Sequence, residues 1–391
     1  MTSPAAIDAI FEHAVTAGTV PGVVAMATTA GGPVYQGAFG MRRLGGETPM
    51  SLDTVFRIAS MTKAITSVAA MQLVEAGKLT ADGPVPAIDP ALAAPQVLTG
   101  FDAQGQPQLR PTKRPITLKH LLTHTAGFCY EIWNPDVERY VAATGMPQMG
   151  TGKLAALRQP LMFDPGERWE YGINIDWAGR LVEEASGQKL DAYCREHIFA
   201  PLGMTDTGFV ASPEQRARQA VVHQRETDGS LTPQPLETPI EREFLAGGGG
   251  LYSTASDYLA FLEALLEDGA VRGQQILKSE TVALMGENHI GGLQAGILKT
   301  NAPAMTNDVD LFPGQPVRWG LGYMLTPETG PNGRSAGSVT WAGLFNTYYW
   351  LDPVKRVAGL IMTQILPFAD GPTVALYGAF ERAVYDALGE R

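Results

Sequence analysis

Sequence typical of β-strands stands at both ends of this chain, and it limits the possible folds more than any other feature. Residues 22–40, GVVAMATTAGGPVYQGAFG, form two strand-like runs joined by Ala-Gly-Gly, which is a hairpin signal. Three further strand-like runs lie near the end of the chain, at residues 317–326, 338–353 and 356–366. Helical patterns separate the two groups. We therefore expect an α/β fold of the α+β type, in which both ends of the chain build one antiparallel sheet flanked by helices.

The middle of the chain predicts a separate, mainly helical unit. From about residue 80 to residue 245 helical patterns alternate with proline-rich loops, and residues 222–245 are polar, as in a surface connection. The segment after them, AGGGGLYSTASDYLAF, opens a helix for which Thr254 is the expected N-cap. We expect a discontinuous α/β domain of residues 1–79 and 246–391, an inserted helical domain of residues 80–245, and the active site between them.

Charge, hydropathy and cysteine content argue against several classes of function. The net charge is −11 and no Lys/Arg cluster occurs, which argues against a nucleic-acid partner. No run approaches the roughly 18–20 apolar residues of a membrane span. The N-terminus lacks the basic start and apolar run of a signal peptide, so we expect a cytoplasmic protein without a membrane partner. Cys129 and Cys194 lack the spacing of a zinc site and are expected to be buried free thiols.

The motif that first suggests a serine hydrolase is rejected because of its context. GRSAG, residues 333–337, matches a nucleophile elbow, which needs a strand before it, a helix after it and a later histidine. Here it lies in a turn-rich loop, and the last histidine of the chain is His289. His120 and His124 have i, i+4 spacing but no glutamate between them and no evident third ligand, so we expect structural histidines and no metal.

The pattern Ser-x-x-Lys occurs twice, and only one copy has a setting that suits catalysis. In the second copy, Ser186 to Lys189, Gly187 is a natural helix end, so the two side chains would not share a helix face. In the first copy, Ser60 and Lys63 both lie at the start of a predicted helix. There the i, i+3 spacing places the two side chains next to each other.

Lys63 stands where the helix macrodipole disfavours a cation. A serine hydroxyl becomes a good nucleophile when a neighbouring base takes its proton. A lysine can be that base only when burial or positive potential destabilises its ammonium group. The start of the helix supplies positive potential, and its free N–H groups can stabilise an oxyanion. A position that is unfavourable for stability therefore suits Ser60 as nucleophile and Lys63 as its base.

Five stretches of the sequence occur in the order seen in a known superfamily. They are FRIASMTKAITSVAAMQLVEAGKL, ITLKHLLTHTAGF, FDPGERWEYGINIDWAGRLVE, PLGMTDTGF and GGGGLYSTASDYLAF. Through them, most of the chain resembles the serine β-lactamase/penicillin-binding superfamily, in its class C β-lactamase-like branch. Within that branch it looks most like the family VIII carboxylesterases. The resemblance implies the β-lactamase/transpeptidase-like fold.

The resemblance also implies that Tyr171, in WEYGIN, joins Ser60 and Lys63 in catalysis. A tyrosinate beside a lysine ammonium can be a base at neutral pH, because the cation lowers the pKa of the phenol. The sequence departs from the lactamase pattern after this tyrosine. Ile173 takes the place of an asparagine, and Asn174 comes one residue later. This departure weakens the case for polar contacts with the side chain of a lactam substrate.

A second departure concerns the strand that lines the site in this superfamily. Lactamases carry Lys-Thr-Gly there, whereas this chain has Trp341-Ala-Gly343, which resembles the esterases. A tryptophan cannot pair with an anion but offers a large apolar surface. Gly343 would let the strand approach the substrate, and the N–H groups of Ser60 and Leu344 would form an oxyanion hole. Trp341 and Tyr130 are the candidates for an apolar wall of the substrate pocket.

These features together predict a serine hydrolase that cleaves carboxylic esters of small to medium size and needs no metal or cofactor. Ser60 would attack the carbonyl, and either Lys63 or Tyr171 would be the base, since their titrations are coupled. An acyltransferase would use the same acyl-enzyme. A β-lactamase or D-alanyl peptidase and a non-catalytic binding protein remain alternatives. The oligomeric state and the natural ester are not predicted.

Overall fold

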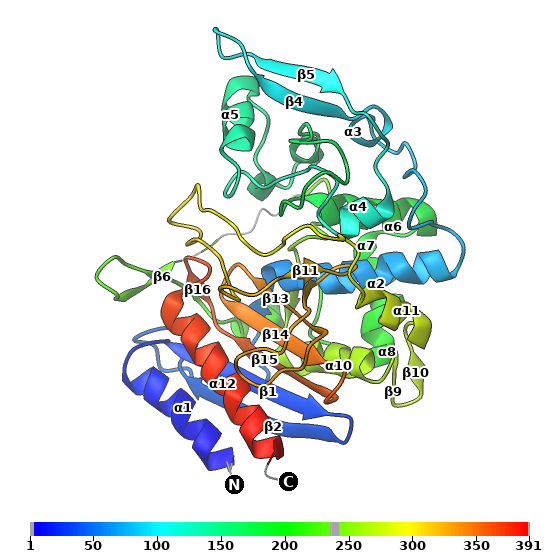
Figure 1. Cartoon of the computed structure of the whole chain (residues 1–391). Helices are drawn as coiled ribbons and strands as arrows, with labels where there is room; N and C mark the ends of the chain where they lie inside the picture. Colours follow the sequence, from blue (N-terminus) through cyan, green and yellow to red (C-terminus); the bar gives the residue numbers. More distant parts are fainter. Residues whose placement is uncertain (1–3, 235, 237–241, 390–391) are drawn as a thin grey trace.

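The computed structural model describes residues 4–234, 236 and 242–389. Its centre is an antiparallel sheet of seven strands in the order β11-β12-β13-β14-β15-β1-β2 (Figure 1). The strands are β1 (Gly22–Thr29), β2 (Gly32–Gly40), β11 (Arg318–Trp319), β12 (Met324–Thr326), β13 (Ser338–Gly343), β14 (Thr347–Asp352) and β15 (Val357–Met362). The two ends of the chain meet where β1 pairs with β15, with Val24 opposite Met362. The predicted sheet and fold class are confirmed.

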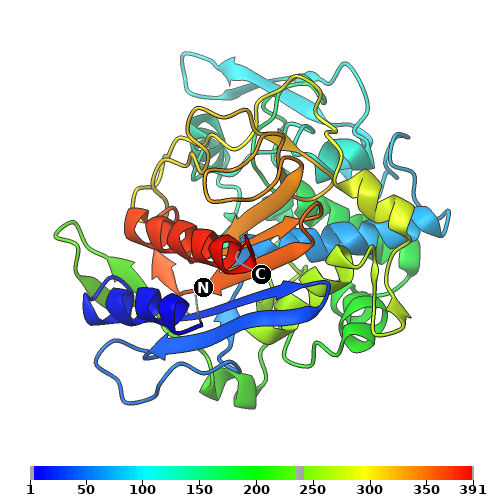
Figure 2. The ribbon, with the colours of Figure 1, turned by 60° about the horizontal axis from the view of Figure 1, so that its bottom comes forward.

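Helices cover both faces of this sheet (Figures 1 and 2). The terminal helices α1 (Pro4–Thr16) and α12 (Gly371–Gly389) lie together on one face, and α10 (Ala255–Leu266) lies on the other. Neighbouring residues of β14 point to opposite faces. Trp350 contacts Phe380 of α12 with ring centroids 5.6 Å apart, whereas Tyr349 contacts Tyr258 of α10 at 5.4 Å. Every residue of β13, β14 and β15 is consequently buried.

The central part of the chain supplies short helices, and those within residues 90–186 lie above the sheet in Figure 1. The short helices are α3 (Pro90–Ala93), α4 (Leu118–Leu122), α5 (Pro135–Thr144), α6 (Asn174–Ser186), α7 (Leu190–Cys194), α8 (Ala200–Leu202) and α9 (Pro213–Ala217). Helix α6 packs against α2 (Thr62–Glu75), which carries Lys63. This contact brings the central segment onto the predicted catalytic helix. The boundaries proposed for an inserted domain stay a prediction.

Three parts of the chain differ from the sequence-based expectation. The central segment contains a hairpin of β4 (Gln96–Phe101) and β5 (Pro107–Pro111), which its mainly helical pattern did not indicate. Residues 222–234, expected to be part of a surface connection, form β6 (Val222–Arg225) and β7 (Leu231–Gln234), and β6 pairs in parallel with β16 (Ile365–Leu366). Residues 317–326 are not one strand, because Gly322 turns the chain at φ +113° between β11 and β12.

Further short elements are β3 (Phe56–Arg57) paired with β8 (Tyr252–Ser253), β9 (Ala270–Val271) paired with β10 (Gln274–Gln275), and α11 (Ser279–Met285). Thr254 accepts a hydrogen bond from the N–H of Asp257 at 3.2 Å, which confirms it as the N-cap of α10. Cys129 and Cys194 are buried free thiols, as predicted. Among the residues that the structure describes, no helix is both long enough and apolar enough to cross a membrane.

Candidate active site

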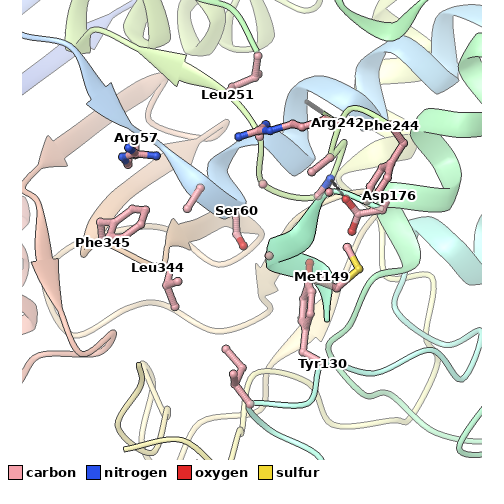
Figure 3. Close-up of a pocket in the computed structure, with 18 of the residues that line it drawn as sticks. Arg57, Ser60, Tyr130, Met149, Asp176, Arg242, Phe244, Leu251, Leu344 and Phe345 are labelled. Carbon is pink, nitrogen blue, oxygen red and sulfur yellow. Dashed lines mark hydrogen bonds between the residues drawn. The ribbon is translucent and has the colours of Figure 1, made fainter. Parts of the chain in front are cut away.

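Ser60 lies on a tight turn between strand β3 and helix α2. The turn is a short 3-10 helix, Ala59–Met61, that continues directly into α2. Ala59, the residue before Ser60, has φ +42°, a conformation that L-residues other than asparagine and aspartate rarely adopt. Such strain persists only where the surroundings enforce it, and it is common at functional sites. The turn presents the Ser60 hydroxyl to a cavity (Figure 3).

Lys63 is fully buried, and its ammonium group makes three polar contacts. Nζ lies 2.6 Å from the carbonyl oxygen of Gly248, 3.2 Å from the Tyr130 hydroxyl and 3.2 Å from Ser60 Oγ. Burial lowers the pKa of Lys63 to about 7, and the charge of Asp176 acts in the opposite direction. The largest cause is therefore burial, whereas the sequence-based argument had stressed the potential at the start of the helix.

Tyr171 lies beside this lysine, just before helix α6. The Lys63 Nζ is 4.6 Å from the centroid of its ring, and the indole Nε1–H of Trp341 donates to its hydroxyl at 2.9 Å. Burial raises the pKa of Tyr171, and hydrogen bonds with Ser60 and Trp341 only partly oppose this rise. We had expected the neighbouring cation to lower this pKa. The structure shows the opposite direction, so Tyr171 keeps its proton at neutral pH.

Asp176 is a site residue that the sequence analysis missed. It lies in the first turn of α6, is buried, and accepts a hydrogen bond from the N–H of Gly248 at 2.9 Å. Its charge raises the pKa of Lys63, and its own pKa is raised by burial. The available signal was an acidic residue five positions after Tyr171, the only charged residue among the first six of the helix. Asp176 lines the cavity, and its charge acts on the buried Lys63 amine without a direct ion pair among the described contacts.

The four glycines of residues 247–250 bring a second backbone segment against Asp176 and Lys63. A Cβ atom on Gly248 would lie 2.6 Å from Asp176 Oδ2, and one on Gly247 would lie 2.9 Å from the carbonyl oxygen of Ile175. Only glycine fits so closely, which confirms the predicted close passage of backbones. The segment can therefore place its Gly248 carbonyl on the Lys63 ammonium.

The Trp-Ala-Gly stretch ends strand β13 next to the Ser60 turn. A Cβ atom on Gly343 would clash with the carbonyl oxygen of Ile58, so glycine is needed for this approach. Leu344, the next residue, lines the cavity together with Ser60. Trp341 was expected to form an apolar wall, but it is buried, is bonded to the Tyr171 hydroxyl and is not among the lining residues. Tyr130 does line the cavity, and its hydroxyl contacts Lys63.

The cavity in front of Ser60 has a volume of about 320 Å³. Its wall is largely apolar, with Ile132, Trp133, Met149, Phe244, Leu251, Leu344 and Phe345 among the lining residues. In Figure 3, Ser60 lies at the centre of the labelled residues, with Arg57 and Arg242 on the side of Leu251 and Tyr130 on the opposite side. The cavity thus places the Ser60 hydroxyl, which contacts the buried Lys63, at a largely apolar wall.

The remaining sequence motifs lie outside this arrangement. Ser186 ends helix α6, Gly187 follows at φ +72°, and Lys189 is exposed. Ser335 lies in the loop before β13, as predicted. His124 is buried beneath Tyr171, with its Nδ1 contacting the side-chain amide of Asn174 at 3.1 Å. Within the described ranges, no group of His, Cys, Asp and Glu side chains is arranged to hold a metal ion.

Comparison with known proteins identifies the family. The sequence profile of the beta-lactamase family matches residues 7–382. The chain belongs to the beta-lactamase family. Family members that resemble it include the lovastatin esterase of Penicillium rubens, which is 34% identical over 97% of this chain and 98% of the relative. The monacolin J acid methylbutanoyltransferase of Aspergillus terreus is 34% identical over 97% of this chain and 95% of the relative.

Solved structures of the family show the same fold. The unliganded simvastatin synthase of Aspergillus terreus superposes with a TM-score of 0.86 at 32% identity, and the alignment covers 98% of each chain. A penicillin-binding protein homologue from Pyrococcus abyssi has a TM-score of 0.70 at 23% identity, covering 98% of this chain and 77% of that one. The full-length relatives include both an esterase and acyltransferases, which supports an enzyme that acts on esters.

Proposed function

We propose that the chain is a serine esterase that cleaves carboxylic esters of small to medium size through an acyl-enzyme on Ser60. One observation carries the proposal. Ser60 Oγ lies 3.2 Å from the Nζ of a fully buried lysine whose pKa is about 7, at the wall of an otherwise apolar cavity. At neutral pH a large fraction of such lysines is uncharged and can accept a proton.

In the proposed reaction Lys63 is the base. A neutral amine has two N–H groups and one lone pair. The two N–H groups can stay on the Gly248 carbonyl and the Tyr130 hydroxyl, so the lone pair faces Ser60 Oγ. Tyr171 is not suited to this first step because its raised pKa keeps it protonated.

The acyl group is transferred in two steps, first to Ser60 and then to water. As Ser60 Oγ bonds to the ester carbon, its proton moves to Lys63, and the N–H groups of Ser60 and Leu344 stabilise the oxyanion. The bond to the alcohol then breaks. Tyr171 donates its proton to the leaving oxygen and regains one from the Lys63 ammonium. Water next attacks the acyl-enzyme by the reverse route, which releases the acid and restores Ser60.

Esters are favoured over β-lactams because the strand that lines the site has no lysine. The position carries Trp341, which is buried and binds Tyr171. Asn174, the nearest asparagine to the lactamase position, donates to the carbonyl oxygen of Phe128 at 2.9 Å and is fully buried. Neither side chain is placed to bind a lactam substrate. The similarity to a lovastatin esterase supports hydrolysis.

Transfer of the acyl group to an alcohol is the second candidate. Methylbutanoyltransferases match this chain over nearly its full length at 32–34% identity, against 34% for the esterase. In this chain, transfer and hydrolysis would share the Ser60 acyl-enzyme and differ only in whether an alcohol or water attacks it. An apolar wall favours an apolar acceptor over water.

The test compares wild type with Ser60→Ala and with Ser186→Ala as the matched control. Each is assayed on 4-nitrophenyl acetate and butyrate, on a chromogenic cephalosporin, and on the esters in the presence of 1-butanol. We expect loss of ester cleavage in Ser60→Ala only, and little lactam turnover. Butyl ester as the main product would assign the transferase. Full activity of Ser60→Ala would contradict the mechanism at its first step.

A further inference from the structure

His124 occupies a strained position next to the tyrosine of the active site. Its backbone has φ +57°, a left-handed conformation that few L-residues other than asparagine, aspartate and histidine adopt. Its side chain is fully buried, and the imidazole ring lies against the phenol ring of Tyr171 with centroids 4.6 Å apart. An apolar residue would serve for packing alone, so the polar contacts of this imidazole need a reason of their own.

His124 is bound to the residues on both sides of Tyr171. Its carbonyl oxygen accepts a hydrogen bond from the N–H of Glu170 at 3.0 Å, and its ring Nδ1 accepts one from the N–H of Gly172 at 3.4 Å. Gly172 also passes close to a second segment, because a Cβ atom there would lie 2.1 Å from the carbonyl oxygen of Phe128. One residue therefore fixes the backbone before and after Tyr171, and its ring supports the phenol between them.

The surroundings also fix the protonation state of the imidazole. Burial, with a smaller contribution from the charge of Lys63, lowers the pKa of His124, so the ring is neutral at neutral pH. A backbone N–H can only donate, so the contact with Gly172 requires a lone pair on Nδ1. The side-chain amide of Asn174 lies 3.1 Å from the same nitrogen. The ring proton therefore lies on Nε2, which has no hydrogen-bond partner among the described residues.

We propose that His124 is a positioning residue for Tyr171, which it holds where the phenol hydroxyl can protonate the leaving oxygen of the ester. The inference rests on the proposed ester chemistry, in which Tyr171 supplies that proton. The hydroxyl accepts a hydrogen bond from the Nε1–H of Trp341 at 2.9 Å and keeps its own proton for donation. Proton transfer needs hydrogen-bond geometry, so a displacement of the phenol by about 1 Å costs up to roughly a hundredfold in rate.

Two butyrate esters that differ only in the leaving group test this role. 4-Nitrophenoxide leaves without a proton, whereas the ethoxide of ethyl butyrate is a poor leaving group and needs the proton of Tyr171. The leaving-group ratio is kcat/KM for 4-nitrophenyl butyrate divided by kcat/KM for ethyl butyrate. Both esters form the same acyl-enzyme, so its hydrolysis does not affect the ratio. A loss of folded enzyme lowers both values equally and leaves the ratio unchanged.

His124→Leu removes the Nδ1 acceptor, and His124→Asn keeps an acceptor oxygen and tolerates the positive φ. We expect His124→Leu to raise the leaving-group ratio about tenfold to a hundredfold, towards the value of Tyr171→Phe, and His124→Asn to raise it less. His120→Leu is the matched control and should keep the wild-type ratio, because the Nδ1 of His120 accepts the N–H of Thr117 at the start of α4. If His124→Leu does not fold, His124→Gly replaces it with the same expectation, since glycine adopts this φ readily.

Two results would overturn the inference while leaving ester cleavage through Ser60 intact. They are a wild-type ratio in His124→Leu, and a wild-type ratio in Tyr171→Phe. If wild type cleaves no ester, the proposed function fails, and fluorine NMR of protein labelled with 3-fluorotyrosine tests the position of Tyr171, whose resonance is assigned with Tyr171→Phe. A resonance that is shifted or broadened in His124→Leu but not in His120→Leu would then support the inference. A resonance unchanged in His124→Leu would refute it.

Discussion

The two Ser-x-x-Lys copies of this chain have identical spacing and opposite structural settings. Ser60 and Lys63 straddle the junction between a strained 3-10 turn and a buried helix, with Nζ 3.2 Å from Oγ. Ser186 and Lys189 straddle the end of helix α6, and the chain turns at Gly187 between them. The first lysine is fully buried, whereas Lys189 is exposed.

The difference shows that the motif depends on its surroundings for its chemistry. Burial brings the pKa of Lys63 to about 7, and burial comes from segments far away in the sequence. Helix α6 packs against the helix that carries this amine, and Gly248 and Tyr130 supply polar partners from outside that helix. Lys189 stays exposed. A four-residue pattern therefore predicts a nucleophile and a base only where the fold removes the lysine from water.

The largest expected difference is between two lysine substitutions. Lys63→Met should lower kcat/KM for 4-nitrophenyl butyrate roughly 10²- to 10⁴-fold, because Ser60 loses its base. Lys189→Met should leave it unchanged. Steady-state kinetics on both variants, with circular dichroism to check folding, measures this. Equal losses of kcat/KM in Lys63→Met and Lys189→Met would show that Lys63 is not the base for Ser60.

A smaller loss is expected where strand β13 meets the Ser60 turn. In Gly343→Ala the new methyl group would clash with the carbonyl oxygen of Ile58, so the strand has to move away from Ser60. We expect a loss of about tenfold in kcat, and overpacking should lower the free energy of unfolding by about 1–3 kcal/mol. Ester kinetics and urea unfolding measure the two effects. Unchanged kcat would argue against Leu344 as part of the oxyanion hole.

The pH dependence of kcat/KM distinguishes Lys63 from Lys189 without a large change in rate. Since Lys63 has to be neutral, kcat/KM should rise with pH and reach half of its maximum near pH 7. The charge of Asp176 raises the pKa of Lys63, so Asp176→Asn should move the curve to lower pH. Lys189→Met should not move it. A curve that stays in place in Asp176→Asn would mean that the carboxylate does not tune the base.

The smallest effect is expected at the second copy. Gly187 has φ +72° and nothing within 4 Å of an added Cβ, so Gly187→Ala introduces backbone strain without a clash. We expect a loss of about 1 kcal/mol in the free energy of unfolding and no change in kcat/KM. Urea unfolding and ester kinetics on the same sample measure both. A loss of activity in Gly187→Ala would contradict the conclusion that the Ser186/Lys189 copy has no role in catalysis.

Local patterns predicted the parts of the structure that local physics determines. The strand runs at both ends of the chain, the N-cap at Thr254 and the helix end at Gly187 follow from residue types and spacing. The sheet formed from both ends was predictable because each group of strands alone would leave apolar edges. The structure also brings Ser60, Lys63 and Tyr171 together.

The parts that were not predicted depend on contacts between distant segments. The parallel pairing of β6 with β16 joins His223 to Ile365, and no local pattern marks such a partner. The same holds for Asp176, whose role follows from Gly248 and Lys63 across the site. Trp341 looked like a pocket wall because sequence cannot show that its indole is buried and bonded to the Tyr171 hydroxyl.

The pairing of β1 with β15 also has a consequence for how the protein is made. Strand β1 lies between β2 and β15, with seven of its eight residues buried. On the ribosome β15 emerges roughly 330 residues after β1, a delay on the order of tens of seconds. During this time the edge of β1 that later pairs with β15 has no strand beside it. Chains stalled before residue 357 should therefore bind a chaperone through the hairpin of residues 22–40, which crosslinking of arrested ribosome complexes would detect, and completed chains should release it.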